Sequence, residues 1–264
     1  MGAYSKIVSV LRQIDTAHTF IGGTKADITS AWVFVNGERQ QVFPSSEVYT
    51  QIYAKTDTGA YSQALPYGRY KIVISGAGGS GCAVARSSQS NISILTQDDG
   101  QAGQEQTIML DVPYGQTKTV SGIIGQGGTA SYARASEHHN AATAGTGGTG
   151  VVNGANGERK TGYTNFTVRW GLASGAGGGA SSLDVDNVET ARVPGGDGGN
   201  VSIRVSAADY RATFSCVGGA GGIGNSTQNG ASGGIHGRAY DGSVYSAAGT
   251  DGYIRIYQSS IYPN

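Results

Sequence analysis

The chain lacks several features that mark whole classes of protein. Proline is scarce, with 5 residues among 264, and the net charge is zero. Charged residues are few, and no run of Lys and Arg is longer than the pair Arg159 and Lys160. Proteins that bind nucleic acid normally carry a clustered basic face. The composition therefore argues against a nucleic-acid partner.

Long apolar runs are missing as well. No stretch of about 20 apolar residues occurs, so no membrane insertion is expected. The first residues carry charges and lack the continuous apolar core of a signal peptide. These patterns predict a soluble protein made in a cytoplasm, and they leave open a final place on a released particle.

Cysteine is nearly absent, with only Cys82 and Cys216, each beside a glycine motif. Two cysteines do not make a disulfide framework. A single disulfide between them and two small buried side chains are both compatible with the sequence.

The N-terminal part carries two local signals. Ile7, Val10, Leu11 and Ile14 follow helical spacing, which predicts one short amphipathic helix over 4–15. Such a short helix must dock, either on its own domain or on a partner subunit.

Asn36-Gly37 lies between two β-rich runs in 31–43 and predicts a hairpin with a type I′ turn. A second strand pair is expected at 48–54 and 69–75. Helix signals are nearly absent after residue 15, so the predicted fold is mainly β. Further strands are expected at 107–112, 118–124, 165–170, 201–205, 212–217 and 253–257.

Glycine is abundant, with 45 residues where an average chain of this length holds about 18. Residues 1–65 hold 5 glycines and residues 66–264 hold 40. This change predicts two domains, an N-terminal attachment module with the hairpin at 1–65 and a glycine-rich domain at 66–264.

Glycines three positions apart form 17 pairs, against 10 pairs two apart and 7 pairs four apart. Period three is typical of an extended threefold helix of the polyproline-II type. Glycine at every third position lets another backbone approach closely. The sequence therefore predicts a glycine-rich sandwich in which strands are combined with packed polyglycine-type helices. The expected scaffold glycines are Gly76, Gly79, Gly145, Gly148, Gly195, Gly198, Gly218, Gly221 and Gly224.

Longer segments between the glycine motifs are expected to emerge as loops at the ends of this scaffold. They are 129–143, 180–194, 225–229 and 238–248. Tyrosine among small polar residues is typical of adaptable recognition loops, although plain solvated connections would look similar. The candidate receptor-binding residues are Tyr132, His138, His139, Asp184, Asp186, Tyr240 and Tyr245.

No catalytic constellation is present, so no enzyme activity and no cofactor are expected. His138 and His139 are adjacent, and neighbours on an extended segment point opposite ways, so no metal site is expected there. Asp184 and Asp186 share a face but lack the full oxygen set that calcium needs. Solvated acids are the favoured interpretation of that pair.

The strand ending in IVISGAGGSG, the repeated GGxGG-type blocks and the final strand DGYIRIY resemble the glycine-rich domains of phage tail-fibre proteins. They resemble in particular the detachable tip adhesin of some T-even-like phages. The resemblance covers the chain from about residue 70 onward and the hairpin at 31–43. It implies a sandwich of short polyglycine helices, distal loops that touch the host receptor, and an N-terminal part that attaches to the fibre.

The leading hypothesis is therefore a virion adhesin that binds a host surface protein or glycan and contacts other virion proteins through 1–65. A purely structural virion protein is the alternative. An ice-binding protein ranks lower, because Thr143, Thr146 and Thr149 keep period three only briefly. Long fibres are often trimeric, whereas a tip adhesin can be a lone copy, so a homotrimer and a single copy both stay open.

Overall fold

The computed structural model describes residues 18–21, 24–27, 31–35, 38–43, 47–88, 91–164, 168–207, 210–224 and 228–261. These residues are mainly β, as predicted, and no helix occurs among them. The helix expected over 4–15 lies outside the described residues. The strands are β1 (His18–Ile21), β2 (Thr24–Asp27), β3 (Ala31–Val35), β4 (Glu38–Phe43), β5 (Tyr49–Lys55), β6 (Gly59–Ser75), β7 (Ala83–Arg86), β8 (Ile92–Gln97), β9 (Gln104–Ile124), β10 (Tyr132–Ala135), β11 (Asn140–Thr143), β12 (Arg159–Thr164), β13 (Val168–Ala173), β14 (Ser181–Val185), β15 (Val188–Val193), β16 (Val201–Ala207), β17 (Tyr210–Cys216), β18 (Gln228–Asn229), β19 (Gly237–Tyr240), β20 (Gly242–Tyr245) and β21 (Tyr253–Ser259).

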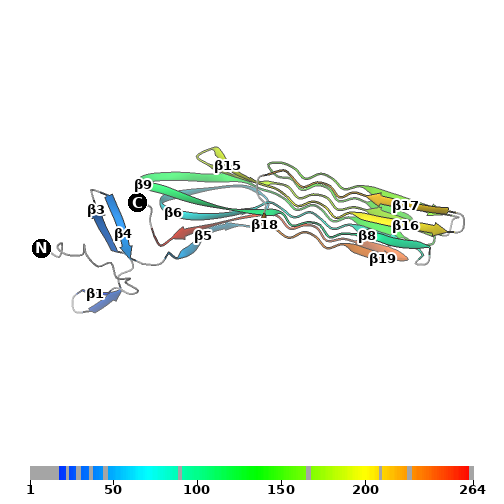
Figure 1. Ribbon diagram of the computed structural model, residues 1–264, viewed down its shortest axis with the longest axis horizontal. Helices are drawn as coiled ribbons and strands as arrows, with labels where there is room; N and C mark the ends of the chain where they lie inside the picture. Colours follow the sequence, from blue (N-terminus) through cyan, green and yellow to red (C-terminus); the bar gives the residue numbers. More distant parts are fainter. Residues whose placement is uncertain are drawn as a thin grey trace.

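The part of the chain from β5 onward is elongated (Figure 1). One group of strands, containing β5, β6, β9 and β15, lies at the end that we call proximal. A second group, containing β8, β16, β17 and β19, lies at the opposite end, which we call distal. Extended segments without strand assignment run between the two groups.

The proximal sheet has the order β15-β14-β9-β6-β21-β5, and β18 pairs with β9. Its core contains Tyr70, Ile72 and Ile74 from β6, which face apolar residues of β21 and β9. The predicted pairing of 48–54 with 69–75 is wrong, because β21 lies between β5 and β6 and pairs with both. A pairing partner about 200 residues later in the chain leaves no local turn signal.

The hairpin predicted at 31–43 is confirmed. β3 and β4 pair antiparallel, with Val35 opposite Glu38. The Asn36-Gly37 turn itself lies outside the described residues.

Strand β6 continues through residue 65, where the glycine content changes, and pairs with β9 along its length. The compositional boundary and the edge of the proximal sheet are therefore different positions. The expected strands at 107–112 and 118–124 are two parts of β9. Those at 201–205, 212–217 and 253–257 correspond to β16, β17 and β21.

Ten extended glycine-rich runs lie between the two groups of strands, and backbone hydrogen bonds order them in three layers. Layer I contains runs 246–252, 125–131 and 144–150 in that order. Layer II contains runs 230–236, 76–82, 174–180 and 151–158. Layer III contains runs 98–103, 194–200 and 217–224. Each layer continues at the distal end into one sheet, respectively β20-β10-β11, β19-β7-β13-β12 and β8-β16-β17.

Run 76–82 shows how the layers are held together. Its N–H groups repeat their direction every three residues: Ala77 and Ser80 both donate to run 174–180, whereas Gly78 and Gly81 both donate to run 246–252. Gly76 and Gly79 donate to Gln104 and Gln101. Carbonyls of this run also accept bonds from runs 125–131, 194–200 and 230–236. The run is therefore enclosed by hydrogen-bonded neighbours on all sides, without a side-chain core.

The glycines make this close approach possible. A Cβ on Gly79 would lie 2.1 Å from the carbonyl oxygen of Asp197, and one on Gly148 would lie 1.8 Å from that of Gln126. All nine glycines expected as scaffold positions face backbone atoms of another segment in this way. Ordering a glycine costs roughly 0.5–1 kcal/mol more than ordering alanine. Each lateral hydrogen bond contributes a net stabilisation of about 1 kcal/mol, which is about equal to this cost of ordering one glycine.

The three distal sheets enclose two cores of different thickness. Between layers I and II the core is made mainly of alanines, including Ala83, Ala133 and Ala173. Between layers II and III it is larger and includes Trp170, Leu172 and Ile203. The inner strand β7 is buried along its whole length, because the middle sheet has a core on each face.

Cys82 and Cys216 are both free and buried in this larger core. A disulfide is therefore absent, and the interpretation as small buried side chains is correct. Burial raises the pKa of the Cys82 thiol to about 12 and that of Cys216 to about 11.

Candidate functional site

The distal end collects chain reversals from all three layers. In layer I, β10 and β11 end together at Ala135 and Asn140. In layer II, β19 ends at Tyr240, opposite Arg86 of β7. In layer III, β16 and β17 end together at Ala207 and Tyr210. The strands that lead from and to the chain termini, β5 and β21, belong to the proximal sheet instead. Every layer therefore has a chain reversal at the distal end, whereas β5 and β21 lie at the proximal end.

All four segments expected as loops contain strands; 225–229 holds the short β18, which pairs with β9, and the other three hold longer strands. These three are 129–143 with β10 and β11, 180–194 with β14 and β15, and 238–248 with parts of β19 and β20. In 132–135, Ala133 and Ala135 are buried while Tyr132 and Arg134 face outward. Alternation with alanine is a weak strand signal, because alanine is depleted in strands. The pattern of this segment therefore predicts a loop rather than a strand.

Tyr132 and Tyr245 come together on the outer face of layer I. They are direct partners across β10 and β20, and their ring centroids are 4.8 Å apart at an angle of 42°. Tyr245 is 70% exposed. A paired, solvent-facing aromatic surface of this kind combines large contact area with few rotatable bonds, which suits recognition of a partner.

Polar groups surround this tyrosine pair. Arg134 is exposed and lies opposite Ser243 on β20, and Thr143 lies opposite Tyr132 on β11. The outer face of layer I therefore offers an aromatic platform with one guanidinium and two hydroxyl groups. Arg134 was missed by the sequence analysis, although its i+2 spacing from Tyr132 places both on one face of a strand.

His138 and His139 lie at the turn between β10 and β11. Ser136 N donates to His139 O at 2.8 Å, and this bond closes the turn. His138 is exposed, and its Nε2 is 4.0 Å from Glu137 Oε2. Within the described residues, no group of three or more His, Cys, Asp or Glu side chains could hold a metal ion. The two histidines are therefore surface groups at the distal end.

Tyr240 also lies at the distal end, but in layer II rather than layer I. It is 55% exposed. Asp241 follows with a positive φ of 48°, and its N–H donates to Arg86 O at 2.9 Å. The short turn to β20 thus fixes the position of Tyr240 close to the edge between the two layers.

Asp184 and Asp186 are separated from the other candidates, because they lie on the proximal sheet. Asp184 is paired with Ser121 of β9. Asp186 and Asn187 have φ values of 52° and 65° and form the turn between β14 and β15. Asp186 Oδ1 accepts a bond from Thr119 N at 2.9 Å. These contacts give Asp186 a role in the turn, at the end opposite to Tyr132 and Tyr245.

The outer face of layer III, on β16 and β17, carries further exposed side chains that the sequence analysis missed. Arg204 and Arg211 lie there beside a shallow hollow. The alternation in VSIRVSA, with Val201, Ile203 and Val205 buried, is the signal that places Arg204 outward.

Comparison with known proteins adds no family. No family model matches the chain, and no curated protein matches it. Among the residues that the structure describes, no helix is long and apolar enough to cross a membrane.

Proposed function

We propose that this chain is a phage tail-fibre or tail-tip adhesin that binds a host surface protein or glycan with its distal end. The observation that carries this proposal is the separation of the two ends. Strands next to the termini lie in the proximal sheet, and chain reversals of all three layers lie at the distal end. A protein that is anchored at one end and binds at the other needs this polarity.

The ten glycine-rich runs are, in this proposal, packed polyglycine-type helices that form a stiff platform. The support is the three-residue repeat of hydrogen-bond direction in run 76–82, since a threefold helix points every third N–H group to the same side. Binding surfaces on a rigid scaffold lose little conformational entropy on association. The displayed tyrosines and arginines then act from fixed positions.

Residues 1–65 attach the chain to other virion proteins in this proposal, which places the mature protein on the phage tail. The location of β5 supports this role, because β5 is the first strand of the proximal sheet in the chain and lies at the end away from Tyr132 and Tyr245. The proposal includes no enzymatic step and no cofactor. The two thiols are buried, and within the part of the chain that the structure describes no group of three or more His, Cys, Asp or Glu side chains could hold a metal ion.

The experiment uses the full chain, labelled with a fluorophore, on a panel of bacterial strains. The distal double variant Tyr132→Ala with Tyr245→Ala is compared with the proximal double variant Tyr67→Ala with Tyr114→Ala. Tyr67 and Tyr114 form the matched control, because their rings also pair, at 5.3 Å, and Tyr114 is 78% exposed. We expect the wild-type chain to label a subset of strains.

The distal variant should lose at least about tenfold in affinity, as for a central aromatic contact, and the proximal variant should bind like wild type. Binding to no strain, together with incorporation into phage particles, would favour the purely structural alternative. Equal loss in both variants would contradict a distal binding surface.

A further inference from the structure

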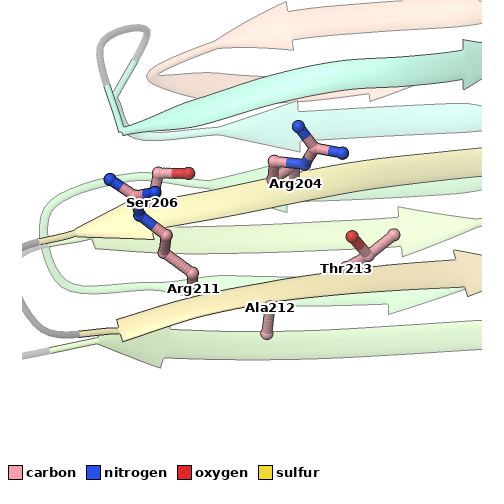
Figure 2. A pocket seen from close by; sticks show the side chains of 5 residues that line it. All are labelled: Arg204, Ser206, Arg211, Ala212 and Thr213. Atoms are coloured by element: carbon pink, nitrogen blue, oxygen red, sulfur yellow. The ribbon is translucent and has the colours of Figure 1, made fainter.

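The outer face of layer III carries a shallow open hollow at the distal end. It is lined by Arg204 and Ser206 of β16 and by Arg211, Ala212 and Thr213 of β17, as Figure 2 shows. Arg204 is the direct partner of Thr213, and Ser206 is the direct partner of Arg211. Directly paired residues lie on the same face of a sheet. Both arginines and both hydroxyl groups therefore face the same side.

This face continues onto the neighbouring strand. Ser93 of β8 is the partner of Arg204 on its other side and is exposed. The opposite face of β16 is held in place, because Ile203 and Val205 are fully buried in the core between layers II and III. The guanidinium groups are thus displayed from a fixed, three-stranded surface.

The charge of this face is not balanced within the described residues. Arg204 and Arg211 are diagonal neighbours, and like charges close together on a sheet are destabilising. Two other arginines are paired with acids: Arg69 with Asp111 at 2.8 Å and Arg192 with Glu189 at 2.6 Å. Among the residues that the structure describes, neither Arg204 nor Arg211 has an acidic partner. An external anion would remove this repulsion.

The lining groups indicate the chemistry of that anion. A guanidinium group binds phosphate and carboxylate oxygens through two parallel hydrogen bonds. The hydroxyl groups of Ser206, Thr213 and Ser93 can donate to or accept from sugar hydroxyls. The hollow is shallow and open, so an extended chain can pass across it. Sites for small molecules normally enclose most of the ligand's surface, and in this hollow a small molecule would leave most of its surface in water.

We propose that the outer face of layer III binds an anionic glycan, whose phosphate or carboxylate groups contact Arg204 and Arg211. This inference rests on the proposed adhesin function and names the ligand class for a second face of the distal end. The tyrosine pair of layer I lies on the other outer face, so the two surfaces can be tested separately.

The test measures binding of the full chain to immobilised probes by biolayer interferometry. One probe is a phosphorylated core oligosaccharide of lipopolysaccharide, with the same oligosaccharide dephosphorylated by hydrofluoric acid as its neutral counterpart. The other probe is oligogalacturonate, with its methyl ester as the neutral counterpart. The two pairs distinguish phosphate from carboxylate as the source of charge. A short DNA duplex tests whether any polyanion is sufficient.

The variant is Arg204→Gln with Arg211→Gln, and its matched control is Lys118→Gln with Arg192→Gln on the proximal sheet. Both remove two positive charges from exposed or half-exposed positions. Wild type should bind at least one charged glycan and not its neutral counterpart. The loss should be about tenfold for each arginine, and the control should stay within about twofold of wild type.

Raising the salt from about 0.1 M to about 1 M shortens the screening length from roughly 10 Å to roughly 3 Å and should weaken wild-type binding. This arm needs no variant. Failure to bind either charged glycan, equal binding of a neutral counterpart, equal binding of the duplex, or unchanged binding by the arginine variant would each overturn the proposal.

Labelling of bacterial cells by the same preparations separates the two proposals. If the arginine variant still labels cells, the adhesin function remains supported and the proposal of an anionic glycan ligand is rejected. Arginine-dependent glycan binding without labelling of any strain would remove the adhesin function instead.

Discussion

Gly79 lies so close to Asp197 that a Cβ added to the glycine would be 2.1 Å from the backbone carbonyl oxygen of Asp197. The neighbouring atom is backbone, and it belongs to a run that is itself hydrogen-bonded, since Gln101 N donates to this same oxygen at 2.7 Å. Neither partner can move without breaking lateral hydrogen bonds. The packing of layers II and III therefore depends on the missing side chain.

Gly79→Ala should destabilise the fold by about 3 kcal/mol or more, at or above the upper end of ordinary overpacking. Urea unfolding followed by tryptophan fluorescence measures the change. Gly242→Ala is the matched control, because its added Cβ would meet only Tyr240 O at 3.8 Å. That substitution should change stability by less than about 1 kcal/mol. Similar stability of the two variants would contradict the close backbone packing.

The turn at Asp186 should matter for stability and not for binding. Asp186→Ala removes a residue that tolerates positive φ and also loses the bond from Thr119 N. We expect a loss of about 1–2 kcal/mol in the free energy of unfolding, measured in urea. Asp186→Asn should stay close to wild type, because asparagine tolerates the same conformation and keeps an acceptor oxygen.

Cell labelling by the Asp186→Ala variant should equal that of wild type, since the residue lies at the proximal end. A loss of cell labelling by a variant that keeps an intact fold would instead indicate that Asp186 belongs to the binding surface.

The two thiols should be unreactive while the protein is folded. Burial raises the pKa of Cys82 to about 12 and that of Cys216 to about 11, and only the thiolate reacts rapidly. An aromatic disulfide reagent at pH 8 should therefore detect no thiol in the native protein and both thiols in about 8 M urea. A Ser243→Cys variant, with an exposed added thiol, is the positive control. Rapid reaction of the native wild-type protein would contradict the buried core.

Stability should fall in alkaline solution. Burial raises the pKa of Cys82 from 9.0 to about 12, and it raises the pKa of Tyr61 well above 10.0. A raised pKa means that the folded state holds the proton more tightly than the unfolded state. This contribution is fully present below about pH 9 and is lost as the pH rises through the folded pKa values. Each group adds a slope of at most about 1.4 kcal/mol per pH unit.

The measurement is urea unfolding at several pH values between 7 and 11. Tyr61→Phe is the informative variant. At pH 7 it should cost about 1 kcal/mol, because Tyr61 Oη donates to Ser182 O at 2.9 Å. Above pH 10 its stability should fall less steeply than that of wild type. Parallel curves for the two proteins would contradict the assignment of Tyr61 to this effect.

Part of the fold could be predicted from local patterns. The three-residue spacing of glycines such as Gly76 and Gly79 predicts close backbone contact, because only glycine presents no side chain to the neighbour. The Asn36-Gly37 signal predicts the hairpin of β3 and β4 from turn chemistry alone. Both predictions depend on interactions that a few adjacent residues specify.

The order of the runs could not be predicted. Lateral bonds such as Ala77 N to Gly179 O join backbone groups, and backbone groups are the same in every residue, so the sequence does not indicate which run adjoins which. For the same reason the position of Asp184 could not be predicted. Its segment, 180–194, resembles the other segments expected as loops in composition, but it belongs to the proximal sheet. Arg204 and Arg211 were missed because their spacing becomes meaningful only when β16 and β17 are known to pair.

Run 76–82 is surrounded by backbone segments and almost no side chains. The residues at the distal turns therefore do not contribute to the hydrogen bonds that stabilise this interior. Under the proposed function, the range of hosts can therefore change through replacement of the distal turns while the glycine-rich runs stay the same. Insertions or deletions between β10 and β11, or between β16 and β17, would alter what is recognised and leave the hydrogen-bonded interior as it was.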